Sequence, residues 1–179
     1  MRALIRFAAA ADAVSAAAGA AATAAVLLAV LISAGNATSR YALGLTSNAW
    51  LEVQWYLFAA IALLGAAQTL KRGAHVRVDL LYAIAGPRGR IWIDVFGLMV
   101  FLLPGMVLLG WLSWPFFWES WLRNEHSNNP GGLYRWPVKV LLPAGFALVV
   151  LQGLAELAKR IAALAGAHRL DTTYNRPLQ

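Results

Sequence analysis

Residues 71–82, KRGAHVRVDLLY, form the densest group of side chains in this chain that could do chemistry. Lys71, Arg72, His75 and Arg77 come almost together, and Asp79 follows them closely. Three roles fit such a group: an active site, an anion-binding loop, or the point where a chain leaves a membrane. The surrounding segments decide between these roles.

Glu52 is the carboxylate most open to a functional interpretation, because it lies at the start of a long hydrophobic run. A charge inside a membrane is costly and marks a functional site by default. Trp50 and Trp55 flank Glu52, however, and indole rings prefer the headgroup level of a bilayer. We therefore expect Glu52 to be a solvated group at interface depth.

The other motifs argue against catalysis and cofactor binding. The chain has no cysteine, which excludes disulfides, thiolate catalysis and zinc–thiolate sites. His75, His126 and His168 all fall outside the long apolar runs, so no haem can be held between histidines inside a bundle. No HExxH, GxSxG or Walker-type motif is present. We expect no catalytic, metal-binding or cofactor-binding residue.

The composition is typical of a membrane protein. The chain is 60% hydrophobic and 13% charged, whereas a soluble domain is about 45–50% apolar and about 25% charged. A net charge of +7 would suggest nucleic acid in a soluble protein. Here the basic residues stand between apolar runs, so we expect membrane phospholipids as partners and no nucleic acid.

Four runs are long enough for a transmembrane helix, which takes about 20 mostly apolar residues. They predict an all-α integral membrane protein, one domain over residues 1–179, with spans at about 13–34, 50–70, 91–117 and 138–160. Pro104 predicts a tilt or kink in the third span. The first run resembles a signal peptide, but its apolar stretch exceeds the usual length of about 7–15 residues, so we expect a retained helix.

Lysine and arginine indicate the orientation of these spans. Eleven lie at the N-terminus, in the second connection and at the C-terminus, and four lie in the first and third connections: Arg40, Arg123, Arg135 and Lys139. The positive-inside rule then predicts that both termini are cytoplasmic. A bacterial inner membrane, crossed several times by the chain, is the simplest host.

Tryptophan supports the same orientation. Of eight tryptophans, only Trp92 lies at the predicted cytoplasmic side. The outer side contains Trp50, Trp55, Trp111, Trp114, Trp118, Trp121 and Trp136. Two roles fit this outer girdle, together with Glu52, Arg135 and Lys139: anchoring at the headgroups, or docking of a partner subunit. The polar connection 119–139, with its NNPGG turn at 128–132, could likewise be a plain connector or a contact for a periplasmic protein.

The orientation makes segment 71–82 a cytoplasmic exit followed by a short helix. Val76, Leu80 and Ile84 recur every four residues, which is typical of one apolar helix face. About ten residues cannot span a bilayer, so we expect an amphipathic interfacial helix at about 75–86. The polar groups expected near lipid phosphates are Lys71, Arg72, His75, Arg77, Asp79, Arg88 and Arg90.

Side-chain pairs at helical spacing predict local contacts within the spans. Asp94 lies four residues after Arg90, and Glu156 lies four before Arg160, so each could form an ion pair on its own helix. Gln54, Gln68 and Gln152 could donate hydrogen bonds between helices.

Two motifs carry a resemblance to a known family. The core RGAHVRVD at 72–79, and the core GGLYRWPVKVLLPAGF with a later LQG at 131–153, resemble the small membrane subunit of tripartite ATP-independent periplasmic (TRAP) transporters. The resemblance covers roughly residues 15 to 162.

The resemblance implies a scaffold. Such a subunit braces a much larger, elevator-type membrane subunit and helps to dock a periplasmic substrate-binding protein. It implies secondary uptake of organic acids, with the substrate site and the coupling Na⁺ in the large subunit and no cofactor in this chain.

Two other functions remain open. An independent four-helix exporter could use Glu52 as its proton carrier, in which case Glu52 must lie at mid-membrane depth. A membrane anchor subunit of an enzyme or redox complex would need haem, flavin or quinone nearby.

Overall fold

The computed structural model describes residues 1–45, 47–73, 82 and 84–167, and each regular element within them is helical. The elements are α1 Arg2–Leu43, α2 Asn48–Lys71, α4 Pro87–Gly97, the π-helical segment Leu98–Leu102, α5 Leu103–Leu122, α6 Trp136–Lys139 and α7 Leu141–Leu164. Among the described residues, four helical stretches are long and apolar enough to cross a membrane: α1, α2, 87–122 and 136–164. The predicted all-α class with four spanning helices is therefore confirmed.

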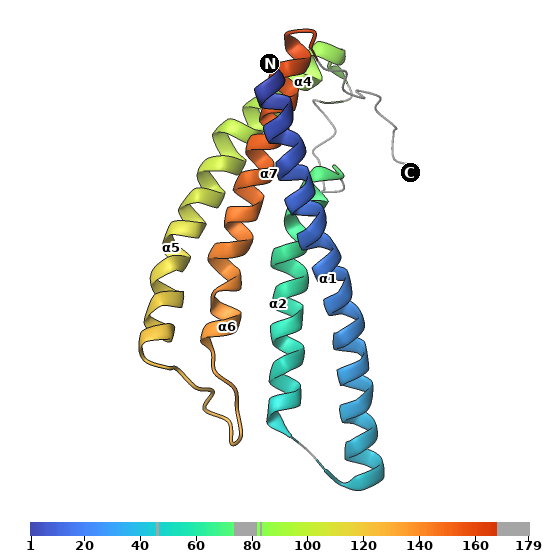
Figure 1. Ribbon diagram of the computed structural model, residues 1–179, viewed down its shortest axis with the longest axis vertical. Helices are drawn as coiled ribbons and strands as arrows, with labels where there is room; N and C mark the ends of the chain where they lie inside the picture. Colours follow the sequence, from blue (N-terminus) through green and yellow to red (C-terminus); the bar gives the residue numbers. More distant parts are fainter. Residues whose placement is uncertain (46, 74–81, 83, 168–179) are drawn as a thin grey trace.

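The central helix of the bundle is α7. It packs against α1, α2 and α5, while α1 runs along α2 (Figure 1). Small residues make this packing close: Ala8, Ala11 and Ala155 form a buried cluster covered by Leu151. Helices in a membrane associate through such small residues, because lipid chains provide no hydrophobic driving force between helices.

Two glycines of α7 mark the closest approaches. A Cβ atom added to Gly145 would lie 2.7 Å from the Cβ of Leu63 on α2. A Cβ added to Gly153 would lie 2.9 Å from a methyl group of Leu102. At Gly145 only glycine fits without a shift of α2, whereas at Gly153 the leucine side chain would have to move.

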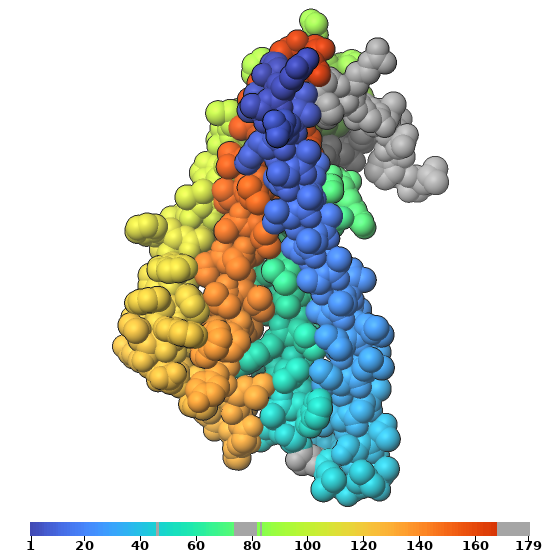
Figure 2. Space-filling model, viewed as in Figure 1, coloured from blue at the N-terminus to red at the C-terminus, as the bar shows by residue number. Residues whose placement is uncertain are grey.

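The first helix is much longer than a single crossing needs. It has 42 residues, which corresponds to about 63 Å, whereas the hydrocarbon core is about 30 Å thick. The predicted span 13–34 is therefore only its middle part, and the alanine-rich segment 2–12 favours helix before it. Figure 2 shows α1 along one edge of an elongated molecule, and α1 ends at Gly44, whose φ is 65°.

The predicted irregularity at Pro104 takes the form of a π turn. Proline has no N–H to give to the carbonyl four residues earlier. In the turn before it the helix widens, and the Leu103 N–H bonds the Leu98 carbonyl five residues back. Helices α4 and α5 nevertheless continue through this segment as one stretch, 87–122.

The two ends of the bundle differ in chemistry. The start of α1, the end of α2, the start of α4 and the end of α7 lie together at one end, which we call the basic end (Figure 1). The end of α1, the start of α2, the connection 123–135 and α6 lie at the other, which we call the loop end. Most of the predicted interfacial helix, 75–86, lies outside the described residues.

Candidate functional site

One face of α2 holds the connection 123–135 at three points. Asn48, Glu52 and Tyr56 are spaced by four residues and therefore share a helix face. The Asn48 side-chain amide donates to the Pro130 carbonyl at 3.1 Å, and the Tyr56 hydroxyl donates to the Tyr134 carbonyl at 2.8 Å. We call these three side chains the clasp.

Glu52 is the middle member of the clasp and makes the most hydrogen bonds to the connection. Its carboxylate accepts hydrogen bonds from the Ser127 hydroxyl, from the Asn129 amide at 2.9 Å and from the Leu133 N–H at 2.7 Å. The residue is only 8% exposed. The expectation of a solvated carboxylate is therefore wrong: Glu52 lies beneath the connection, and donors of the connection take the place of water.

The connection itself is a short hairpin. The Ser127 N–H bonds the Leu133 carbonyl at 2.9 Å, and the Arg135 N–H bonds the Glu125 carbonyl at 2.8 Å. Gly131 has a φ of 70°, which a residue with a side chain rarely adopts. Gly132 lies so close to Ser127 that an added Cβ would be 2.5 Å from the serine Cβ. The NNPGG turn thus closes the hairpin over Glu52.

Glu125 ties the hairpin to α6 on its other side. It forms ion pairs with Lys139 and, at 3.4 Å, with the Arg135 guanidinium. The Lys139 ammonium also lies 4.0 Å from the centre of the Phe116 ring. The hydrogen bond from Lys139 is the main cause that holds the pKa of the Glu125 carboxyl below its usual value.

The predicted aromatic girdle is exposed at the loop end, apart from Trp136, which is half-buried. Trp114 and Trp118 stack with ring centres 6.3 Å apart, and Trp121 meets Trp136 edge to face at 4.6 Å. The remaining members, Trp50, Trp55 and Trp111, are each more than half exposed. Trp92, at the basic end, is exposed as well. The girdle is thus available to lipid or to a partner subunit.

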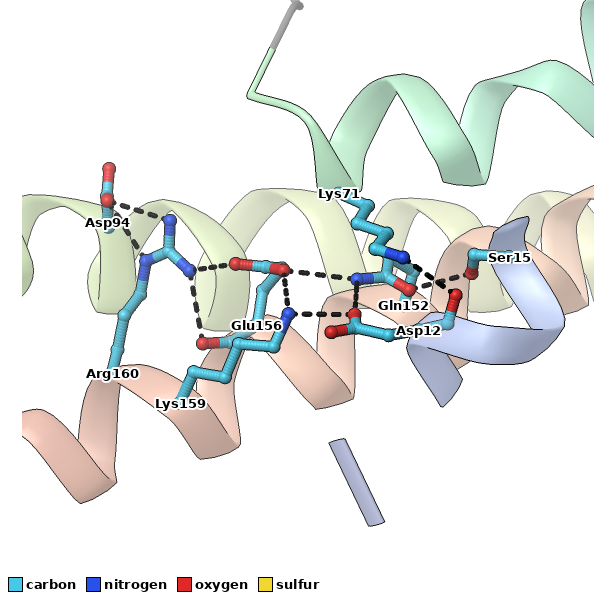
Figure 3. A network of polar contacts seen from close by, with 8 residues as sticks. All are labelled: Asp12, Ser15, Lys71, Asp94, Gln152, Glu156, Lys159 and Arg160. Atoms are coloured by element: carbon cyan, nitrogen blue, oxygen red, sulfur yellow. Dashed lines mark hydrogen bonds and ion pairs between the residues drawn. The ribbon is translucent and has the colours of Figure 1, made fainter. Parts of the chain in front are cut away.

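A network of charged and polar side chains joins the helices at the basic end (Figure 3). Gln152 of α7 accepts from the Ser15 hydroxyl at 2.7 Å and donates to Asp12 at 2.9 Å. Lys159 pairs with Asp12 at 2.8 Å and with Glu156 at 2.7 Å. The Lys71 ammonium donates to the Asp12 carbonyl at 3.0 Å, which brings in α2.

Arg160 extends this network to α4. It pairs with Glu156, as the four-residue spacing predicted, and with Asp94 at 3.0 Å. Asp94 also accepts from the Tyr82 hydroxyl at 3.1 Å. We call the set of Asp12, Ser15, Lys71, Asp94, Gln152, Glu156, Lys159 and Arg160 the four-helix network. Its three carboxylates balance its three cations, so it neutralises its own charge.

The sequence reasoning found only part of this network. Asp94 contacts Arg160 of another helix, whereas the spacing had suggested a local pair with Arg90, whose guanidinium donates to the Tyr82 carbonyl at 3.1 Å. Gln152 confirms the predicted interhelical hydrogen bond, but Gln54 donates to Trp50 of its own helix. Asp12 and Ser15 were missed, although two polar residues three apart in an alanine run were the available signal.

The basic segment at the end of α2 is only partly described. Lys71 enters the four-helix network, and Arg72 caps α2. Arg88 and Arg90 lie in the first turn of α4. His75, Arg77 and Asp79 lie outside the described residues, so a lipid-facing role for this set stays a prediction.

The clasp and the four-helix network fit structural roles, because their carboxylates are already bonded to other side chains or to the backbone. The carboxylates of the clasp and of the four-helix network each have hydrogen-bond or ion-pair partners. Within the described residues, no group of three or more His, Cys, Asp or Glu is placed to hold a metal ion.

Residues 29–163 match the family described as tripartite ATP-independent periplasmic transporters, DctQ component. No curated protein and no solved structure matches the chain. The matched region includes α2, the clasp and most of the four-helix network.

Proposed function

The chain belongs to the DctQ component family of TRAP transporters, and from this premise we propose that it braces a large permease subunit in the membrane and helps to dock a periplasmic binding protein. As a member of that family it is a small inner-membrane transporter subunit and not an enzyme. Membership also implies that it works with a large membrane subunit and a binding protein.

The observation that carries the bracing role is the absence of charge inside the spans. Residues 13–39, 53–70, 95–118 and 140–155 contain no Asp, Glu, Lys, Arg or His. A secondary transporter binds substrate and ions near the middle of the bilayer, at polar or broken helices. These stretches place no charged group there, and we propose that the substrate and the coupling Na⁺ bind in the partner subunit.

The four-helix network supports the same role. It fixes α1, α2, α4 and α7 to one another at the basic end. A brace must keep its shape while an elevator-type partner moves, and paired charges in a low-dielectric region resist separation. Cleavage of α1 near Gly35 would remove Asp12 and Ser15 from the network, which gives retention of this helix a physical reason.

The orientation follows from the positive-inside rule. We place the basic end in the cytoplasm and the loop end in the periplasm, because most lysines and arginines lie at the basic end. The hairpin 125–135 and the aromatic girdle then face the compartment in which a binding protein delivers substrate. We propose an organic acid as the substrate class, on the family resemblance alone.

Co-purification tests this proposal. The chain is expressed with the large TRAP membrane subunit of its own source and extracted in mild detergent, and we expect one stable complex of the two subunits. A chain that purifies alone, even when its neighbour is present in excess, would overturn the bracing role.

The position of Glu52 argues against the exporter alternative, in which this residue would carry the proton. Glu52 lies in the first turns of α2, at the loop end, and its oxygens accept three hydrogen bonds from the hairpin. A proton carrier needs a carboxylate at mid-span that can exchange with water. The geometry of Glu52 fits a structural anchor.

A further inference from the structure

The hairpin at the loop end is held in one shape from two sides. The clasp on α2 fixes Pro130, Leu133 and Tyr134 through their backbones. Glu125 fixes the base of the hairpin to Arg135 and Lys139. Figure 1 shows this connection extending beyond the ends of α5 and α6. A loop that is tied at so many points loses little conformational entropy when it binds a partner.

The hairpin presents an aromatic pair outward. The rings of His126 and Tyr134 lie 3.9 Å apart, and the backbones of the two residues pair as an isolated antiparallel bridge. Both residues are exposed, Tyr134 by 47%. The exposed turn beside them consists of Asn128, Asn129, Pro130 and Gly131. Tyrosine is enriched among the residues that dominate binding at protein interfaces.

This face is electrically neutral. Arg123 pairs with Glu119 at 3.9 Å, and Glu125 pairs with both Arg135 and Lys139. Glu52 is surrounded by uncharged donors. The three carboxylates and three cations near the hairpin therefore balance, and electrostatic steering by this surface should be weak.

We propose that the His126–Tyr134 face of the hairpin is the surface on which the periplasmic binding protein docks, and that Glu52 is the positioning residue that holds this face in shape. The inference rests on the proposed function, because it takes the loop end as periplasmic. The contact is made by rings and amides and depends little on salt. Glu52 does not touch the partner and acts through Ser127, Asn129 and Leu133.

The test measures docking and hairpin order in the same variants. The chain and its large subunit are placed together in lipid nanodiscs, and binding of the purified binding protein is followed by biolayer interferometry. Hydrogen exchange reports the order of the hairpin amides, above all the Leu133 N–H. The variants are Tyr134→Ala and His126→Ala on the face, Glu52→Gln beneath it, and Glu119→Gln as the matched control, since Glu119 loses the same charge in an exposed pair.

We expect both face variants to weaken docking by about tenfold, mainly through faster dissociation. Glu52→Gln should weaken docking and speed exchange at Leu133, because an amide has only one acceptor oxygen for three donors. Glu119→Gln should change neither readout. Raising NaCl from about 50 mM to about 500 mM should change the docking affinity by less than about threefold, since the charges near the hairpin sum to zero and the contact is made mainly by rings and amides.

Several results would overturn the inference. Docking at wild-type strength by both face variants would show that the partner binds elsewhere. Faster exchange in Glu52→Gln with unchanged docking would make Glu52 a residue of local structure only. Strong weakening by salt would show a charged contact. If the binding protein bound equally well to nanodiscs that lack this chain, the proposed docking function itself would fail, while the exchange measurement would still report on the clasp.

Discussion

Asp12 and Lys159 lie 147 positions apart in the chain, yet their side chains form an ion pair of 2.8 Å. The contact joins the beginning of the first helix to the end of the last. Lys159 lies between Asp12 and Glu156, so one cation serves carboxylates from two helices. This arrangement ties the first and last helices together at the basic end, which supports the proposed bracing role.

Asp12→Asn should destabilise the bundle by about 2 kcal/mol, because it removes a charged partner from Lys159 and a good acceptor from Gln152. The free energy of unfolding in detergent, or the midpoint of thermal unfolding, measures this loss. Glu119→Gln breaks a pair whose side chains are 77% and 66% exposed, so it should cost less than about 1 kcal/mol. Equal effects of the two changes would contradict a structural role for the four-helix network.

Gly145→Ala should cost about 1–3 kcal/mol, since the new methyl group would meet the Leu63 Cβ at 2.7 Å and separate α7 from α2. Gly97→Ala is the matched control, because an added Cβ there meets nothing within 4 Å. The control should be neutral or stabilising by up to about 1 kcal/mol. The difference in unfolding midpoint between the two variants checks the prediction, and a Gly145 variant as stable as the control would refute the close packing of these helices.

The ion pairs of Glu125 predict a pH dependence of stability. The folded-state pKa of Glu125 lies below its ordinary value of 4.5, mainly because Lys139 donates a hydrogen bond to the carboxylate. The contribution is therefore present above that ordinary value and is lost as pH falls through the lowered pKa. Glu125→Gln should lower the unfolding midpoint at about pH 7, and this difference should shrink as the pH falls below the ordinary value and through the lowered pKa of the wild-type carboxyl. A midpoint difference that stays constant over this range would show that the ion pairs contribute nothing.

The helix count and the apolar spans could be predicted from the sequence, because each span only requires about 20 apolar residues in a row. The local pair of Glu156 and Arg160 followed from helical spacing in the same way. The long-range partners could not be predicted. Asp94 has suitable cations both four residues before it and 66 residues after it, and only the packing of α4 on α7 places it beside Arg160.

The structural role of Glu52 could not be predicted from the sequence either. Its flanking tryptophans predict a position at interface depth, but its burial depends on a hairpin that begins more than 70 residues later. Three donors of that hairpin converge on one carboxylate only because Gly131 and Gly132 allow the turn to close. Alternation or spacing in the local sequence contains no sign of this contact.

Replacing Arg72, Arg77, Arg88 and Arg90 with glutamine should weaken the inside bias of the chain and lower the fraction inserted with cytoplasmic termini. Reporter fusions at the C-terminus measure that fraction. Replacing Arg40 and Arg123 with glutamine is the control, because these residues belong to the sparser, outer set and their loss should leave the orientation unchanged or strengthen it. An unaltered orientation in the fourfold variant would show that other features determine the topology.

Substrate uptake by proteoliposomes tests the central claim most directly. The large subunit and the binding protein are reconstituted with and without this chain, and the chain is also reconstituted alone under both a sodium and a proton gradient. We expect uptake only when the three components are together, and no transport by the chain alone. Transport by the isolated chain, abolished by Glu52→Gln, would contradict the account and restore the exporter alternative.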